Sequence, residues 1–305
     1  MVVALSLRSG NHSARHQRRS EAAPTTNISG GRVDVAQLFN VRGYGTVITG
    51  GASGLGLAYA EIMVDCGARV TLMDKNAAAL SGEVARLRSA GGDVRGEHVD
   101  VTDAAALDQA FERTATFYGG LDVVFANAGI DAGPGFMTTE GARNPDGALE
   151  NVSLEHWNKV IAVNLTAVFT TLQATARVMK RFGNGGRIIV TSSNAAIINE
   201  SIVGTPYMPA KAGVEHLVRH AALELAEYGI TVNAIAPGAF QTNIAGGRLK
   251  IPADRQAFEK RSLQRRVPTT DEIKGLALFL ASPASAYMTG ASILIDGGTA
   301  LGRLD

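Results

Sequence analysis

The sequence has a single cysteine, few aromatic residues and no long apolar run. With Cys66 alone, the 305-residue chain excludes an intrachain disulfide and a cysteine-based zinc cluster, and we expect no bound metal. No apolar run reaches the roughly 18 residues that a membrane-spanning helix requires. We therefore predict a protein that does not bind membranes and lies in the cytoplasm, where cysteines stay reduced.

An excess of charge of either sign is also missing. Lys and Arg number 29 against 28 Asp and Glu, which gives a net charge of +1. Such a balance gives no global attraction to nucleic acid or to an anionic membrane surface. Residues of hydrophobic type make up 46% of the chain, enough for the core of one α/β domain of about 250 residues.

The first 38 residues differ from the rest of the chain. They are rich in Arg, Ser, His and Gly, and the first acidic residue is Glu21. Because nothing in this stretch can bury a sizeable apolar surface, we predict a disordered basic arm over residues 1–38 and a folded domain over 39–305. A mitochondrial-type presequence is the second interpretation, although no amphipathic helix is evident; the apolar VVAL is too short for a secretory signal.

From residue 41 onward, short apolar runs alternate with segments of helical periodicity, including a long helix over 154–182. Apolar runs of this kind are typical of parallel strands whose two faces are both covered by helices. The pattern predicts an α/β fold: a single doubly wound Rossmann-type domain with a seven-stranded parallel sheet. The expected strands are 45–50, 68–74, 93–101, 121–129, 186–193, 229–238 and 291–298.

A glycine-rich turn, TGGASGLG, lies between the first expected strand and the first helix. Gly50, Gly54 and Gly56 allow the backbone to turn tightly and to approach a pyrophosphate, whose charge the helix N-terminus stabilises. Ser53 and Leu55 belong to the same turn. Glycine turns are also common for purely structural reasons, but this position between strand and helix favours dinucleotide binding.

Asp74 follows the turn by about 20 residues, at the end of the second expected strand. There its carboxylate would accept hydrogen bonds from the adenosine ribose and repel a 2′-phosphate, which favours NAD over NADP. A helix-capping Asp is the structural alternative. The neighbouring Lys75 is a cation that weakens the discrimination against NADP.

Tyr207 and Lys211 are four residues apart where a helix is expected to begin, near Met208. That spacing places both on one helix face. They could be an exposed aromatic–cation pair of little energetic value. Alternatively, the ammonium lowers the pKa of the phenol from about 10 toward neutrality, which would make Tyr207 a usable proton acceptor.

Together these motifs resemble the short-chain dehydrogenase/reductase family, over about residues 41–300. TGGASGLG is similar to the family's cofactor turn, and ANAG (126–129) to its NNAG, with Ala126 in place of the first Asn. Ser193 lies 14 residues before Tyr207, one more than is typical, and Asn194 occupies the usual distance. We favour Ser193, because it ends a strand and the following loop can absorb an insertion.

The resemblance implies a role for each matching residue. Tyr207 would be the general acid/base, Lys211 would lower its pKa and bind the nicotinamide ribose, and Ser193 would hydrogen-bond the substrate oxygen. Asn164 would anchor a water that links Lys211 to solvent; otherwise it is a solvent-facing helix residue. Further cofactor contacts are implied for Asp100, Val101, Asn127, Ala128, Gly129, Pro237, Gly238, Phe240 and Thr242.

We therefore expect hydride transfer between NAD(H) and a secondary alcohol or ketone. Residues 131–153 and 243–268 should flank the substrate, the second as a mobile lid. Cations in the lid allow an anionic substrate, whereas five other residues suit an apolar one: Phe136, Met137, Ile197, Ile198 and Phe240.

Two other functions compete with this one. An NAD-sensing regulatory protein would be expected to lack Tyr207 or Lys211. An epimerase or dehydratase of the same superfamily would carry a longer carboxyl-terminal domain. By resemblance we expect a homotetramer, or secondly a homodimer, that pairs through the helices at 154–182 and 208–228.

Overall fold

The computed structural model describes residues 34–302. The arm predicted for residues 1–38 therefore falls largely outside the described residues, as do residues 303–305. Within residues 34–38, Val35–Leu38 form the single-turn helix α1, and the Asp34 side chain caps it by accepting a hydrogen bond from the Ala36 N–H. These residues are helical where we predicted disorder.

Seven parallel strands form one sheet in the order β3-β2-β1-β4-β5-β6-β7. This confirms the predicted doubly wound fold. The strands are β1 (Gly45–Thr49), β2 (Arg69–Asp74), β3 (Val94–His98), β4 (Val123–Ala126), β5 (Gly186–Thr191), β6 (Ile230–Pro237) and β7 (Ser292–Ile295).

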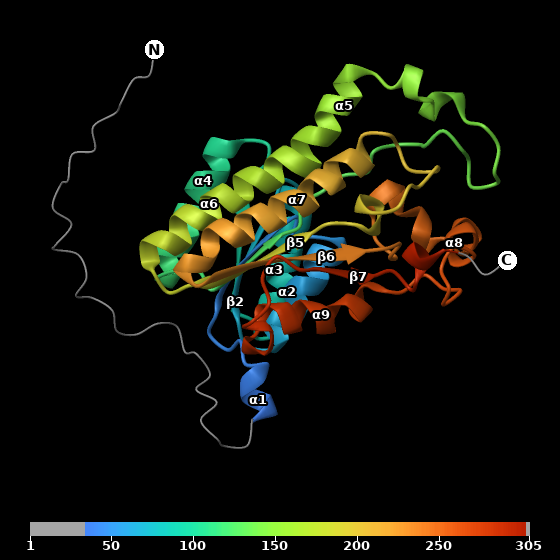
Figure 1. The fold of residues 1–305 in the computed structure, drawn as a ribbon. Coiled ribbons are helices and arrows are strands. Elements are labelled where there is room, and N and C mark those ends of the chain that lie inside the picture. The colour runs from blue at the N-terminus through green and yellow to red at the C-terminus, as the bar shows by residue number, and fades with distance from the viewer. Residues whose placement is uncertain (1–33, 303–305) are drawn as a thin grey trace, which may run out of the picture.

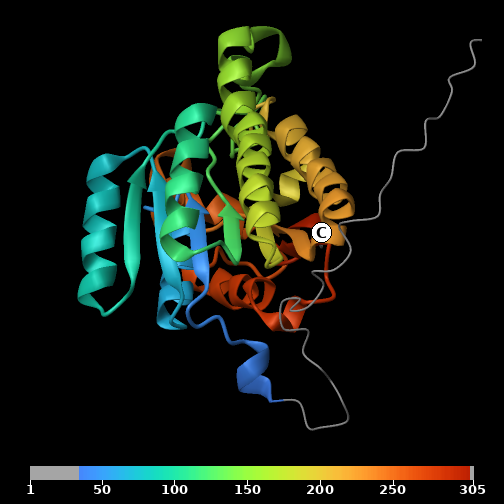
Figure 2. The ribbon, with the colours of Figure 1, turned by 90° about the vertical axis from the view of Figure 1, so that its left-hand side faces the viewer.

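Helices cover both faces of the sheet (Figures 1 and 2). Helices α4, α6 and α7 bury one apolar cluster against the sheet, and α2, α3 and α9 bury a second on the opposite face. Their bounds, with those of α5 and α8, are α2 (Gly54–Asp65), α3 (Ala77–Ser89), α4 (Ala104–Tyr118), α5 (Leu154–Ile161), α6 (Ala167–Phe182), α7 (Tyr207–Leu225), α8 (Pro252–Glu259) and α9 (Lys274–Ala281).

The core explains why the strands read as continuous apolar runs. All five residues of β1 and all four of β4 are buried, since helices cover them on both sides. Tyr59 on α2 is fully buried and stacks on Phe125 of β4, with 4.8 Å between ring centroids. Burying an aromatic side chain of this kind contributes about 2 kcal/mol to stability. This contact therefore holds α2 against β4.

The helix predicted over residues 154–182 is interrupted. Between α5 and α6, residues Ala162–Thr166 form one wide π-helical turn. Such turns insert an extra residue into a helix and occur often at functional sites. Asn164 lies within this turn, which periodicity alone did not reveal.

The strand order reverses between β1 and β4, so the crossover helices leave to opposite sides there. In an open parallel sheet, this arrangement opens a crevice at the carboxyl ends of the strands. Among the described residues, no helix is long and apolar enough to cross a lipid bilayer.

Candidate active site

A cavity of ≈ 510 Å³ lies at the carboxyl ends of the strands. Of the residues predicted to bind the cofactor or to carry out catalysis, all but Gly56 line it. They are Gly50, Ser53, Gly54, Leu55, Asp74, Asp100, Val101, Asn127, Ala128, Gly129, Asn164, Ser193, Tyr207, Lys211, Pro237, Gly238, Phe240 and Thr242.

The glycine turn forms the floor of this cavity between β1 and α2. Gly50 has φ +64°, a left-handed conformation that side-chain-bearing residues rarely adopt. Gly56 does not line the cavity; instead, a Cβ there would collide with the Gly50 carbonyl and approach the Asn127 Nδ2 to 2.6 Å. Gly56 therefore acts by letting α2 pack tightly against the turn.

Asn127 ties three strand ends together. Its Nδ2 donates to the carbonyls of Thr49 (3.1 Å) and Gly50 (3.3 Å), and its Oδ1 accepts from the Thr191 hydroxyl at 3.0 Å. Ala126 stands where the NNAG motif has its first Asn. The hydrogen bonds of Asn127 join β1 to β5 across β4, while Ala126 is simply buried in the core.

Two carboxylates mark the end of the cavity beyond β2 and β3. Asp74 accepts hydrogen bonds from the backbone N–H groups of Ala52 (3.1 Å) and Asn76 (2.9 Å), so it supports both the glycine turn and the start of α3. Asp100 accepts from the Thr102 N–H and hydroxyl, and these bonds hold the pKa of Asp100 below its usual value. Lys75 also lines this end.

Asn164 is fully buried, which excludes the solvent-facing alternative. Its Oδ1 accepts from the Ile130 N–H at 2.9 Å, and its Nδ2 donates to the Ile130 carbonyl at 3.0 Å. The side chain therefore clamps the turn that follows β4 and fixes the backbone just before Asp131. A role in anchoring water remains a prediction.

Ser193 lies two residues after the end of β5 and lines the cavity together with Tyr207. Its Oγ accepts from the Ala195 N–H at 3.2 Å, which fixes the position of the hydroxyl. Asn194 does not line the cavity, and its Nδ2 donates to Asp296 at 3.4 Å instead. The extra residue of spacing is thus absorbed in the loop after Ser193.

Lys211 is 3% exposed, and its Nζ donates to the Thr191 carbonyl at 2.8 Å. Burial lowers the pKa of Lys211 to about 8, although the charge of Glu215 opposes the shift. At neutral pH the ammonium is therefore charged, but it lies much closer to losing its proton than an exposed lysine does.

Burial raises the pKa of Tyr207 to about 12. The hydrogen bond from Ser193 works against this shift, and the negative charge of Asp131 adds to it. We predicted that Lys211 lowers this pKa toward neutrality; burial raises it instead, and the Lys211 Nζ, 5.7 Å from the Tyr207 ring centroid, donates to the Thr191 carbonyl. Desolvation of the phenolate outweighs the nearby cation.

The residues present fit a dinucleotide. The glycine turn exposes backbone N–H groups at the start of α2, and Asp74 provides an acceptor at the far end of the cavity. In addition, the Ser192 hydroxyl lines the cavity, is buried, and lacks a hydrogen-bond partner among the described residues. An orphaned buried hydroxyl costs stability unless a ligand satisfies it.

Residues that the sequence analysis missed complete the wall. Asp131 follows the clamped Ile130 and lines the cavity, and its negative charge raises the pKa of Tyr207. Its place two residues after ANAG, in the turn that follows β4, was the available signal. From the expected lid, three residues line the cavity: Asn243, Ile244 and Leu249.

The segment 131–153 contributes less than expected. Beyond Asp131, none of its described residues lines the cavity, and it pairs instead with the loop before α7 through the Pro134–Val203 bridge. Of the apolar residues proposed to contact substrate, Phe240 lines the cavity, whereas four do not: Phe136, Met137, Ile197 and Ile198.

Known proteins are similar to this chain in sequence and in fold. A family model described as enoyl-(acyl carrier protein) reductase matches residues 50–300. The 2,5-dichloro-2,5-cyclohexadiene-1,4-diol dehydrogenase of Sphingobium indicum is 36% identical over 258 residues, 84% of this chain and 96% of that protein. The cis-4-hydroxycyclohexanecarboxylate dehydrogenase of Sinomonas cyclohexanicum is 35% identical over 254 residues, 83% of this chain and 94% of that protein.

A solved structure agrees over nearly the whole described chain. The NADPH-dependent 3-quinuclidinone reductase of Rhodotorula rubra superposes with a TM-score of 0.77 at 33% identity, covering 92% of this chain and all of that one. With the sheet order, the glycine turn and the Ser193–Tyr207–Lys211 arrangement, these matches show that the chain is an oxidoreductase of the short-chain dehydrogenase/reductase family.

Proposed function

We propose that the protein transfers a hydride between NAD(H) and the carbinol carbon of a secondary alcohol or ketone, with Tyr207 as general acid/base. One observation carries the proposal. Tyr207, Ser193 and Lys211, which lies one helical turn from Tyr207, line the same cavity as the glycine turn. A proton-transfer group and a dinucleotide cradle thus share one enclosed space.

Each residue has a separate task in this scheme. Tyr207 takes the hydroxyl proton of an alcohol, or gives a proton to the oxygen of a ketone, and Ser193 holds that oxygen by a hydrogen bond. Lys211 keeps a positive charge beneath the site. The bound cofactor supplies the hydride acceptor or donor, and the positive ring of its oxidised form favours the Tyr207 phenolate. Asn164 holds the Ile130–Asp131 turn in position.

NAD is the proposed cofactor because Asp74 lines the cavity at the end of β2. Its two carboxylate oxygens accept backbone hydrogen bonds at this end of the cavity, and a carboxylate in that place disfavours a 2′-phosphate. Lys75 lies beside it, and the fungal quinuclidinone reductase described above is named as NADPH-dependent. Cofactor choice is therefore the first property to measure.

Neutral ring alcohols are the proposed substrates. Two relatives are named for alcohols on six-membered carbon rings, and one of those substrates carries a carboxylate. In this chain, Ile130, Phe240 and Leu249 give the cavity an apolar wall, while Asp131 places a negative charge near Tyr207. A carboxylate on the substrate would be repelled there, so we favour ring alcohols and ring diols without one.

A homotetramer, or secondly a homodimer, is the proposed assembly. Large apolar side chains are exposed on the helices expected to pair: Leu154 on α5 (78% exposed), Phe169 on α6 (48%) and Leu223 on α7 (80%). Such residues on adjacent helices are typical of a subunit interface. The cytoplasmic location expected from the sequence stays a prediction.

The test is absorbance at 340 nm with NAD or NADP and three alcohols: cyclohexanol, 1,4-cyclohexanediol and cis-4-hydroxycyclohexanecarboxylate. We expect reduction of NAD with the two neutral alcohols. Asp74→Ala should shift the ratio of kcat/KM for NAD over NADP by about 10-fold or more toward NADP. Turnover with NADP alone would contradict the role of Asp74. Cofactor binding without turnover of any alcohol or ketone would favour the NAD-sensing alternative.

A further inference from the structure

Helix α7 carries four ionisable side chains on one face at a spacing of four residues: Tyr207, Lys211, Glu215 and Arg219. The proposed reaction uses the first two. Glu215 is only 6% exposed, although glutamate is rarely buried unless it has a partner. A buried carboxylate one helical turn beyond Lys211 therefore requires an explanation.

Glu215 is held from a second element. Its Oε1 accepts a hydrogen bond from the Ser292 hydroxyl at 2.8 Å, and Ser292 is the first residue of β7. Within residues 34–302, no arginine or lysine lies within ion-pair distance of Glu215. Two cations of α7 lie one helical turn from Glu215: the exposed Arg219 and the buried Lys211, whose pKa the charge of Glu215 raises.

Lys211 in turn has few neighbours that stabilise a charge. Its Nζ donates to the Thr191 carbonyl of β5, and the π-helical turn presents the neutral Asn164. The ionisable groups around it are Tyr207 and Glu215 on α7 and Asp131 after β4, and Asp131 is exposed. Glu215 is thus the buried anion that can balance the buried ammonium, since solvent screens a charge at Asp131 much more strongly.

We propose that Glu215 is a positioning residue whose negative charge, fixed by Ser292, keeps Lys211 protonated beside Tyr207. Without that charge, burial would favour neutral lysine. The proposal rests on the proposed function only for its catalytic consequence. The electrostatic coupling between Glu215 and Lys211 can be measured on the protein alone.

The first test follows thermal unfolding from pH 6.5 to pH 10.5. Lys211 has a pKa of about 8 when folded and 10.5 when free, so the unfolded chain binds more protons between these values. Its contribution to stability therefore rises with pH through this window and is lost as pH falls through about 8. In Glu215→Gln the folded pKa drops further, so the rise in Tm should begin about one pH unit lower.

Three variants separate charge from hydrogen bonding. Glu215→Gln removes the charge but can still accept from Ser292. Ser292→Ala keeps the charge of Glu215 and removes the hydrogen bond. We therefore expect the pH at which Tm begins to rise to shift by less than half as much as in Glu215→Gln. Glu215→Asp retains a carboxylate and should restore a profile close to that of the unmodified protein.

The second test is NADH binding, followed by nucleotide fluorescence over the same pH range. A charged Lys211 binds ribose hydroxyls better than a neutral one. Affinity should fall above about pH 8 in the unmodified protein and about one pH unit earlier in Glu215→Gln. If NADH fails to bind at any pH, the proposed function is wrong, while the unfolding profiles still decide the coupling.

Coincident unfolding profiles for the unmodified protein and Glu215→Gln would overturn the proposal. So would an equal shift in Ser292→Ala and Glu215→Gln, because the hydrogen bond rather than the charge would then control Lys211. A shift in Glu215→Gln that Glu215→Asp reverses would support it.

Discussion

Lys274 and Lys211 are both helix lysines with little exposure, but their surroundings are opposite. Lys274, at the start of α9, contacts two carboxylates: Glu61 at 2.8 Å and Asp271 at 2.6 Å. Lys211 contacts a neutral carbonyl, and its nearest buried anion is a helical turn away. Lys274 therefore belongs to a cluster of ion pairs, whereas the ammonium of Lys211 contacts no carboxylate.

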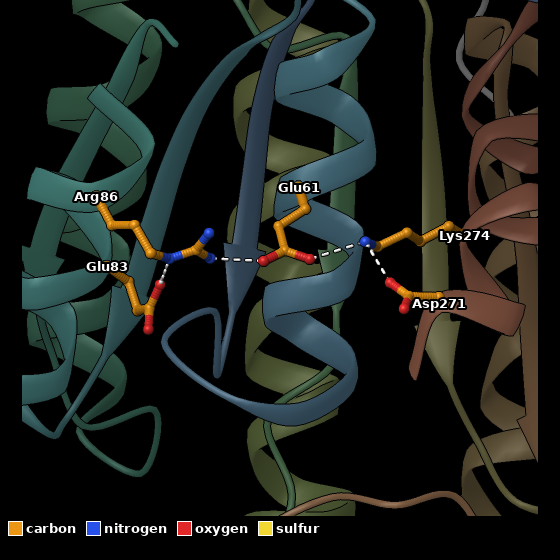
Figure 3. Close-up of polar contacts among 5 residues, drawn as sticks. All are labelled: Glu61, Glu83, Arg86, Asp271 and Lys274. Atoms are coloured by element: carbon orange, nitrogen blue, oxygen red, sulfur yellow. Dashed lines mark hydrogen bonds and ion pairs between the residues drawn. The ribbon is translucent and has the colours of Figure 1, made fainter. Parts of the chain in front are cut away.

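The cluster around Lys274 joins three helices on one face of the sheet (Figure 3). Glu61 on α2 lies between Lys274 and Arg86 of α3, and Arg86 also pairs with Glu83 at 2.6 Å. Burial alone would raise the pKa of Glu61, but hydrogen bonds from Lys274 and Arg86 outweigh it and lower that pKa. Burial would likewise lower the pKa of Lys274, yet its two carboxylate partners raise it.

In the site, burial prevails instead. It lowers the pKa of Lys211 to about 8 and raises that of Tyr207 to about 12. Paired charges are fixed in one protonation state, which suits a structural contact. The pKa of a buried group that contacts no opposite charge responds strongly to the charge of a bound ligand. A site that transfers protons needs pKa values that respond in this way.

The largest expected effect on kcat/KM, and the largest difference between the two regions, comes from removing the charge of each lysine. We expect Lys211→Met to reduce kcat/KM for alcohol oxidation by about 100-fold or more, because the site loses its cation. Lys274→Met should leave kcat/KM within about twofold, since the cluster lies outside the cavity. Both are measured at 340 nm, with the far-UV spectrum as a check on folding. Equal losses in the two variants would erase the distinction between the regions.

A smaller effect is expected from the centre of the cluster. Glu61→Gln removes one partner from both Arg86 and Lys274, and we expect a loss of about 1 kcal/mol in the free energy of unfolding. Urea denaturation measures this loss, and activity should not change. The loss should shrink in high salt, because these side chains are partly exposed. An unchanged midpoint would show that the cluster adds no stability.

The sheet and the position of the cavity were predictable because they depend on strong, repeated patterns. Apolar runs marked the strands, and a parallel sheet places their carboxyl ends together, so Asp74, Ser193 and Pro237 could be brought to one edge from sequence alone. The glycine turn was recognisable because Gly50 needs a left-handed backbone that few other residues adopt.

Other features depend on tertiary packing that the sequence does not display. The π-helical turn at Asn164 keeps helical periodicity on both sides, so the extra residue left no visible sign. The direction of the Tyr207 pKa shift depends on desolvation of the phenol within the cavity, whereas the sequence showed only the adjacent cation. Nothing in the sequence indicated that Glu215 is buried, because its hydrogen-bond partner Ser292 lies 77 residues later, on β7.

The most direct test of the account is Tyr207→Phe, which removes one hydroxyl and leaves the ring in place. If Tyr207 transfers the proton, kcat should fall by about 100- to 10,000-fold while the affinity for NADH, measured by fluorescence, stays within a few-fold. If the variant oxidises alcohols at a rate close to that of the unmodified protein, another group moves the proton and the proposed role of Tyr207 is wrong.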